Sequence, residues 1–155
     1  MSAHRATVEW ALVDGDDFPK GRYSRVHTIG FDGGISVPGS ASPSVVPAPW
    51  SSAEAVDPEA AFTAALSACH MLTFLDLARR AGFGISAYRD EAEGTLARVA
   101  RGKMAVTRVV LRPRITWTGE TLPSPEELDA LHHEAHELCF IANSVTTEVV
   151  VEAAG

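Results

Sequence analysis

The sequence predicts an α+β fold, because strand-like and helix-like segments occur in separate groups along the chain. A strand-rich region precedes each of two helical segments, and a last strand closes the chain. With 155 residues and 46% hydrophobic content, the chain has the size and composition of a single domain covering residues 1–155.

A first hairpin is expected from residues 6–13 (ATVEWALV) and 22–31 (RYSRVHTIGF), which are rich in β-branched and aromatic residues. Turn-forming residues separate the two runs. After a short strand, ISV, residues 38–56 form a serine-rich connection with four prolines, which is too long for a simple turn.

A helix is expected from Asp57 to about Ala81. Asp57 can cap the first N–H groups, and Pro58 and Glu59 suit the first turn. Gly82 suits the end. Because the helix is apolar on nearly every side, other elements must enclose it, and dimerisation is an economical way to achieve this.

The second half of the chain has two strand-like runs, residues 86–99 and 104–117, joined by a tight turn at 101–103. A capping-box pattern at residues 124–127 opens a second helix, whose apolar stripe is Leu128, Leu131, Ala135 and Leu138. Residues 144–152 form the last strand.

Charge and hydropathy exclude several kinds of partner. A net charge of −7 disfavours nucleic acid and anionic membranes, which require a basic face. No secretory signal is visible, and polar residues interrupt the most apolar segment, 60–81, so we expect a cytoplasmic protein with no membrane span.

Two cysteines are the candidate reactive residues: Cys69 in SACHMLTFL and Cys139 in AHELCFIANS. Taken singly, each fits a small buried hydrophobic residue. A reducing compartment would keep a purely structural pair as thiols, so a disulfide between them would belong to the chemistry. Each cysteine also has a histidine nearby, His70 and His136.

Two segments carry a resemblance to the OsmC/Ohr family: DPEAAFTAALSACH is similar to the family's first-cysteine segment, and HELCFIANS resembles its second. The order of elements is similar along essentially the whole chain. The resemblance implies an OsmC-like fold with antiparallel sheets around a long buried helix, an intertwined homodimer, and reduction of organic hydroperoxides. It implies no cofactor and a thiol or lipoyl-type reductant.

By the same resemblance Cys69 is the peroxidatic cysteine, Cys139 resolves it, Glu59 is the supporting acid, and an arginine of the first hairpin completes the site. A fixed cation lowers the pKa of a thiol, and a second thiol converts the sulfenic acid to a disulfide. Only one of Arg22 and Arg25 can point to the site, because residues an odd number apart face opposite sides of a strand. We favour Arg25, because Arg22 follows Gly21 at the margin of the strand.

Helix geometry adds an inference about Glu59. Ten residues separate it from Cys69, about 15 Å along a helix, so Glu59 cannot support the cysteine of its own helix. We therefore expect a second subunit to supply it.

Two other functions fit parts of the sequence. His70, His132, His136 and Cys139 could form a thiolate and imidazole metal site, although we expect none. The chain departs from the family where Phe140 follows Cys139 in place of proline. A lipid-like ligand bound between subunits, without peroxidase activity, is the other alternative.

Overall fold

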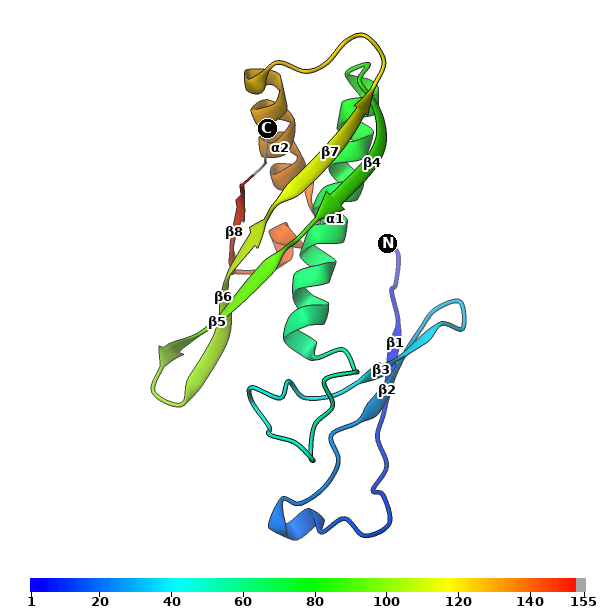
Figure 1. The fold of residues 1–155 in the computed structure, drawn as a ribbon, viewed down its shortest axis with the longest axis vertical. Helices are drawn as coiled ribbons and strands as arrows, with labels where there is room; N and C mark the ends of the chain where they lie inside the picture. The colour runs from blue at the N-terminus through cyan, green and yellow to red at the C-terminus, as the bar shows by residue number, and fades with distance from the viewer. Residues whose placement is uncertain (153–155) are drawn as a thin grey trace. The chain divides into compact units, whose positions relative to one another are not determined.

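The computed structural model describes residues 1–152 and has the predicted α+β fold, with two α-helices and three small sheets (Figure 1). The chain divides into two compact units, Met1–Ala61 and Phe62–Gly155. Helix α1 (Pro58–Arg80) runs across the boundary.

The first unit contains an antiparallel sheet of β1 (Ala6–Glu9), β2 (His27–Phe31) and β3 (Ser36–Gly39), in that order. The predicted hairpin is present, but its strands are shorter than expected. A 3₁₀ turn, η1 (Phe18–Lys20), lies in the connection, and Trp10, Phe18 and Tyr23 pack against one another there. This aromatic cluster takes the place of further strand pairing.

Helix α1 begins and ends as the sequence predicts. The backbone N–H of Ala60 donates to Asp57 Oδ1 at 2.8 Å, and Gly82 follows the helix with a φ of +88°. Among the described residues α1 is also the helix long and apolar enough to cross a membrane, but core helices of soluble proteins pass the same test.

Among residues 1–152, which the structure describes, one face of α1 is buried and the other is exposed. Leu66, His70 and Phe74 lie on the buried face. On the other face Leu72 is 65% exposed, and three alanines are exposed as well, Ala64, Ala65 and Ala68. The expected enclosure of α1 is therefore incomplete in one chain.

The strands of the second unit are divided more finely than predicted. Each of the two long runs is broken, giving β4 (Gly84–Asp90), β5 (Glu93–Ala100), β6 (Lys103–Leu111) and β7 (Pro113–Thr118). Strands β5 and β6 form the hairpin, and β4 pairs with β7 in a separate antiparallel sheet. At the break, the backbone N–H of Arg112 donates to Asp90 Oδ1 at 2.6 Å, so a side chain replaces the strand partner.

Strand β8 (Glu148–Val151) pairs parallel with β6, which makes it an exception to the otherwise antiparallel sheets. It follows helix α2 (Pro125–Leu138) and a 3₁₀ turn, η2 (Ala142–Ser144).

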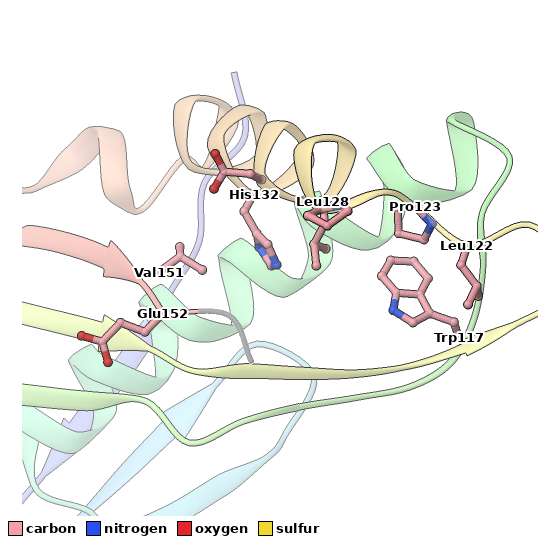
Figure 2. Close-up of a pocket in the computed structure, with 9 residues that line it drawn as sticks. Trp117, Leu122, Pro123, Leu128, His132, Val151 and Glu152 are labelled. Carbon is pink, nitrogen blue, oxygen red and sulfur yellow. The ribbon is translucent and has the colours of Figure 1, made fainter. Parts of the chain in front are cut away.

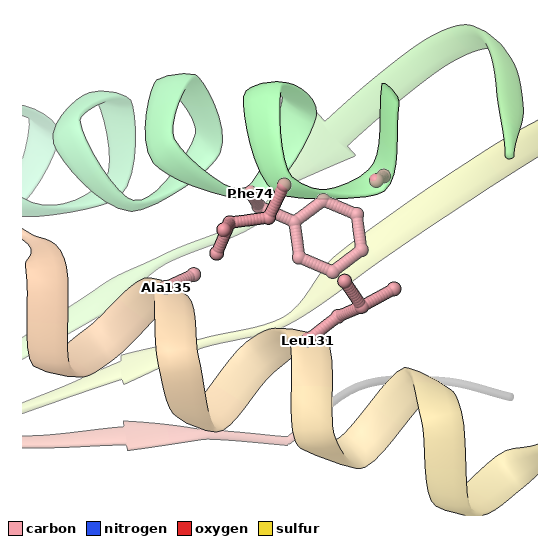
Figure 3. Close-up of a cluster of buried hydrophobic side chains, with 5 residues drawn as sticks. Phe74, Leu131 and Ala135 are labelled. Atoms are coloured by element: carbon pink, nitrogen blue, oxygen red, sulfur yellow. The ribbon is translucent and has the colours of Figure 1, made fainter. Parts of the chain in front are cut away.

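The predicted capping box opens α2: Ser124 Oγ accepts from the Glu127 N–H, and Glu127 accepts from the Ser124 N–H. Leu131 and Ala135 of α2 pack against Phe74 of α1 (Figure 3). Leu138, predicted to share this buried stripe, is 48% exposed, because the stripe turns away from the core before the end of the helix.

Candidate active site

Cys69 lies in the middle of α1, at the border between its buried and exposed faces. Its neighbour Ala68 is exposed, its neighbour His70 is buried, and Cys69 itself is half-buried. A thiol at this border can lie against the protein interior and still be reached by a small molecule.

Cys139 forms the C-terminal cap of α2 and is 1% exposed. Its sulfur accepts a hydrogen bond from the backbone N–H of Ala142 at 3.4 Å, and its carbonyl accepts from the Asn143 N–H at 3.0 Å. The turn that follows α2 therefore holds Cys139 in place.

The two thiols, 70 residues apart in the sequence, lie close enough for the Cys69 side chain to raise the pKa of the Cys139 thiol. Burial, and next the contact with Cys69, raise the pKa of the Cys139 thiol. Cys139 is therefore protonated at neutral pH. The arrangement places a half-buried cysteine near a buried one.

A pair of buried histidines lies beside this contact. His70 Nε2 and His132 Nδ1 are 3.0 Å apart, and the two rings are stacked with their centroids 5.4 Å apart. His132 also stacks on Phe74 at 4.3 Å. Burial lowers the pKa of each histidine to about 4, so both are neutral at pH 7 and share one hydrogen bond.

Arg25 and Arg22 both lie in the first unit, before β2 and not on a strand. The strand-alternation argument for choosing between them therefore does not apply. Arg25 is half-buried, donates to the carbonyls of Gly21 and Tyr23, and lies over the Tyr23 ring at 3.7 Å. Arg22 is exposed and pairs with Asp17 at 3.0 Å. Arg25 is therefore more buried than Arg22 and is held by more groups, and the preference for Arg25 now rests on this difference.

Glu59 lies in the first turn of α1, ten residues before Cys69 on the same continuous helix. The helix is therefore formed as the sequence argument assumed, with a rise of about 15 Å between the two residues.

A polar cluster that the sequence did not reveal surrounds the buried side of α1. Ser67 Oγ donates to Asp90 Oδ2 at 2.5 Å, and the charge of Asp90 acts on both His70 and Tyr88. Burial raises the pKa of Tyr88, whose hydroxyl has no hydrogen-bond partner among the described residues. Asp90 lies inside the strand-like run 86–99 of the sequence and ends β4 in the structure. Nothing in its local sequence indicates that its carboxylate belongs to this cluster.

Comparison with known proteins identifies the family. A family model described as OsmC-like protein matches residues 51–154, a segment that contains both cysteines, both α-helices and β4 to β8. The chain belongs to the OsmC-like family. No curated protein matches the chain.

Solved structures give the same OsmC-like assignment. An OsmC-like protein of unknown function from Vibrio cholerae is 50% identical, with a TM-score of 0.96 over 99% of this chain and 100% of that one. An organic hydroperoxide resistance protein OsmC from Legionella pneumophila is 18% identical, with a TM-score of 0.73 over 100% and 98%. OhrB of Bacillus subtilis is 17% identical, with a TM-score of 0.68 over 99% and 98%. The last two comparisons establish a shared fold only.

The metal alternative finds no support in this OsmC-like site. Within residues 1–152 no group of three or more histidine, cysteine, aspartate or glutamate residues is placed to hold a metal ion. The hydrogen bond between His70 and His132 also occupies two of the ring nitrogens that would have to bind it.

Proposed function

We propose that this protein is a thiol-dependent peroxidase that reduces organic hydroperoxides to alcohols, with Cys69 as the peroxidatic and Cys139 as the resolving cysteine. The proximity of the two thiols, which shows in the effect of Cys69 on the pKa of Cys139, is the observation that carries the proposal. Its OsmC-like relatives named as organic hydroperoxide resistance proteins support the substrate class.

In the first step the Cys69 thiolate attacks one oxygen of the peroxide bond. The O–O bond breaks, the other oxygen leaves as an alkoxide that takes a proton to form the alcohol, and Cys69 becomes a sulfenic acid. The half-buried position of Cys69 suits this step, because the sulfur must meet a substrate from outside.

In the second step the Cys139 thiol attacks the sulfenic sulfur. The S–S bond forms, the sulfenic oxygen leaves as water with the thiol proton, and both cysteines end in a disulfide. The proximity of the two thiols favours this condensation. A dithiol or lipoyl-type reductant then returns two electrons and two protons.

Activation of Cys69 requires a fixed positive charge, and Arg25 is the residue we assign to it, with Glu59 orienting its guanidinium. Because Glu59 lies about 15 Å along the helix from Cys69 of the same chain, we place Glu59 and Arg25 of one subunit beside Cys69 of the other. The exposed apolar face of α1, which includes Leu72, is the surface we assign to this homodimer.

Two free cysteines fit a reducing compartment, and we assign the reaction to the cytoplasm.

Intact mass spectrometry tests the proposal directly. One equivalent of cumene hydroperoxide added to the reduced protein should remove two hydrogens from the mass and produce one equivalent of alcohol. Peptide mapping should then find Cys69 linked to Cys139. An unchanged mass with the peroxide left intact would contradict the proposal.

A further inference from the structure

We infer that a pocket within the second unit, separate from the thiol pair, binds an uncharged amphiphile whose hydroxyl group meets Nε2 of His132. The pocket has a volume of about 600 Å³ and lies between α2, the end of β7 and the end of β8 (Figure 2). Its lining residues are Trp117, Leu122, Pro123, Pro125, Leu128, Asp129, His132, Val151 and Glu152.

The walls of the pocket are mainly apolar. Figure 2 shows the Trp117 ring near Pro123 and Leu122 at one end of the lining, with Leu128 next to them. An aliphatic or aromatic body fits such walls, because burying apolar surface is favourable by about 25 cal/mol per Å².

His132 supplies a buried polar group at the wall of the pocket. Its side chain points from α2 into the space (Figure 2), and the residue is only 4% exposed. The Nδ1 atom is used by His70, whereas Nε2 has no hydrogen-bond partner among the described residues. An unsatisfied buried polar atom costs about 1–3 kcal/mol, so a ligand that pairs with Nε2 removes that cost.

The chemistry of neutral imidazole selects the ligand group. Burial keeps His132 neutral at pH 7, and Nε2 of a neutral ring is either a donor or an acceptor, according to the tautomer. A hydroxyl group can donate or accept and therefore fits both tautomers, whereas a carboxylate fits only one.

The acidic residues of the lining disfavour an anion. Glu152 is paired with Arg112 at 3.2 Å, which offsets its charge. Asp129 is exposed on the same helix as His132 and adds a negative charge to the rim. A long-chain alcohol is therefore preferred over the corresponding fatty acid.

Neither cysteine lines this pocket, so the site does not depend on the proposed peroxidase activity. Every lining residue belongs to the second unit of the chain.

Trp117 provides a direct readout of binding. In a Trp10→Phe/Trp50→Phe background it is the remaining tryptophan. Decan-1-ol should change its fluorescence in a saturable way at pH 7, and decanoate should bind at least about tenfold more weakly, equivalent to about 1.4 kcal/mol.

Two exposed acids on α2 give a matched pair of variants. Asp129→Asn should strengthen decanoate binding toward that of decanol, whereas Glu134→Gln removes the same charge outside the lining and should leave both affinities unchanged. His132→Phe keeps a ring to stack on Phe74 and should weaken decanol binding about tenfold. If His132→Phe does not fold, the acid pair still decides the charge argument.

Three results would overturn the inference. The first is an absence of any saturable change at Trp117 with decanol, as expected if a second copy of the chain already covers the pocket. The second is equal binding of decanol and decanoate in the parent and in Asp129→Asn. The third is decanol binding that is equally strong in the parent and in a folded His132→Phe variant.

Discussion

The surroundings of the two cysteines differ, and this difference supports the roles that we propose for them. Cys69 is half-buried at the edge of an exposed helix face, whereas Cys139 is 1% exposed with its thiol pKa raised by burial. A nucleophile must reach an external peroxide, while a resolving thiol needs to reach only its partner.

Serine variants test these roles. Cys69→Ser should abolish hydroperoxide reduction. Cys139→Ser should keep the first turnover but accumulate sulfenic or over-oxidised Cys69, because no thiol remains to condense with it. Single-turnover peroxide consumption followed by intact mass measures both outcomes. First-turnover rates that are equal in wild type and Cys69→Ser would exclude Cys69 as the nucleophile.

The buried histidine pair predicts that the protein becomes less stable in mild acid. The pKa of His70 and of His132 falls from 6.5 to about 4 on folding, so the unfolded chain binds more protons between these values. The free energy of unfolding should therefore be fully retained above about pH 6.5 and decrease toward pH 4, by on the order of a few kcal/mol.

Urea unfolding at pH 7 and pH 5 measures this loss. His132→Gln should reduce the difference between the two pH values, whereas the exposed neighbour His133→Gln should not. An identical pH dependence in all three proteins would mean that other groups are responsible.

At the scale of elements, the contact between α1 and α2 depends on Phe74. It is fully buried and packs against Leu131 and Ala135 (Figure 3). Phe74→Ala should lower the free energy of unfolding by about 3–5 kcal/mol, because it removes a large buried ring and leaves a cavity.

Phe140→Ala is the matched control, because Phe140 is 82% exposed just beyond α2. Its effect in the same urea titration should stay within about 0.5 kcal/mol. Similar losses for both variants would show that Phe74 is not the main contact between the helices.

The sequence predicted elements well where local chemistry sets their ends. Asp57, Gly82 and Ser124 act on backbone groups within a few residues, so their patterns located both helices correctly. The break between β5 and β4 was missed because it depends on Asp90 meeting the backbone of Arg112, 22 residues away.

The candidate site shows the same division. Both cysteines were recognisable from their segments, but the contact of His70 with His132 joins residues 62 positions apart and has no local signal. Arg25 was predicted to lie on a strand. In the structure β2 begins only at His27, and aromatic packing replaces strand pairing in the connection that contains Arg25.

For the whole molecule, the proposed site combines residues of two chains. One face of α1 stays exposed in a single chain although it is apolar, with Leu72 at 65% exposure. A second copy of α1 is the partner we propose for this face, and it would bring Glu59 and Arg25 of one subunit to Cys69 of the other.

Mixing two inactive homodimers, Cys69→Ser and Arg25→Ala, under conditions that allow subunit exchange tests this arrangement. If each site combines two chains, one site of a mixed dimer carries both defects and the other is wild type, so about half of the wild-type activity per mixed dimer should return. If each site lies within one chain, every site keeps a defect and no activity returns.

Arg22→Ala in place of Arg25→Ala serves as the control and should be active before mixing, because Arg22 is exposed and paired with Asp17. Native mass spectrometry must find the mixed dimers, and unchanged inactivity in their presence would refute the shared site.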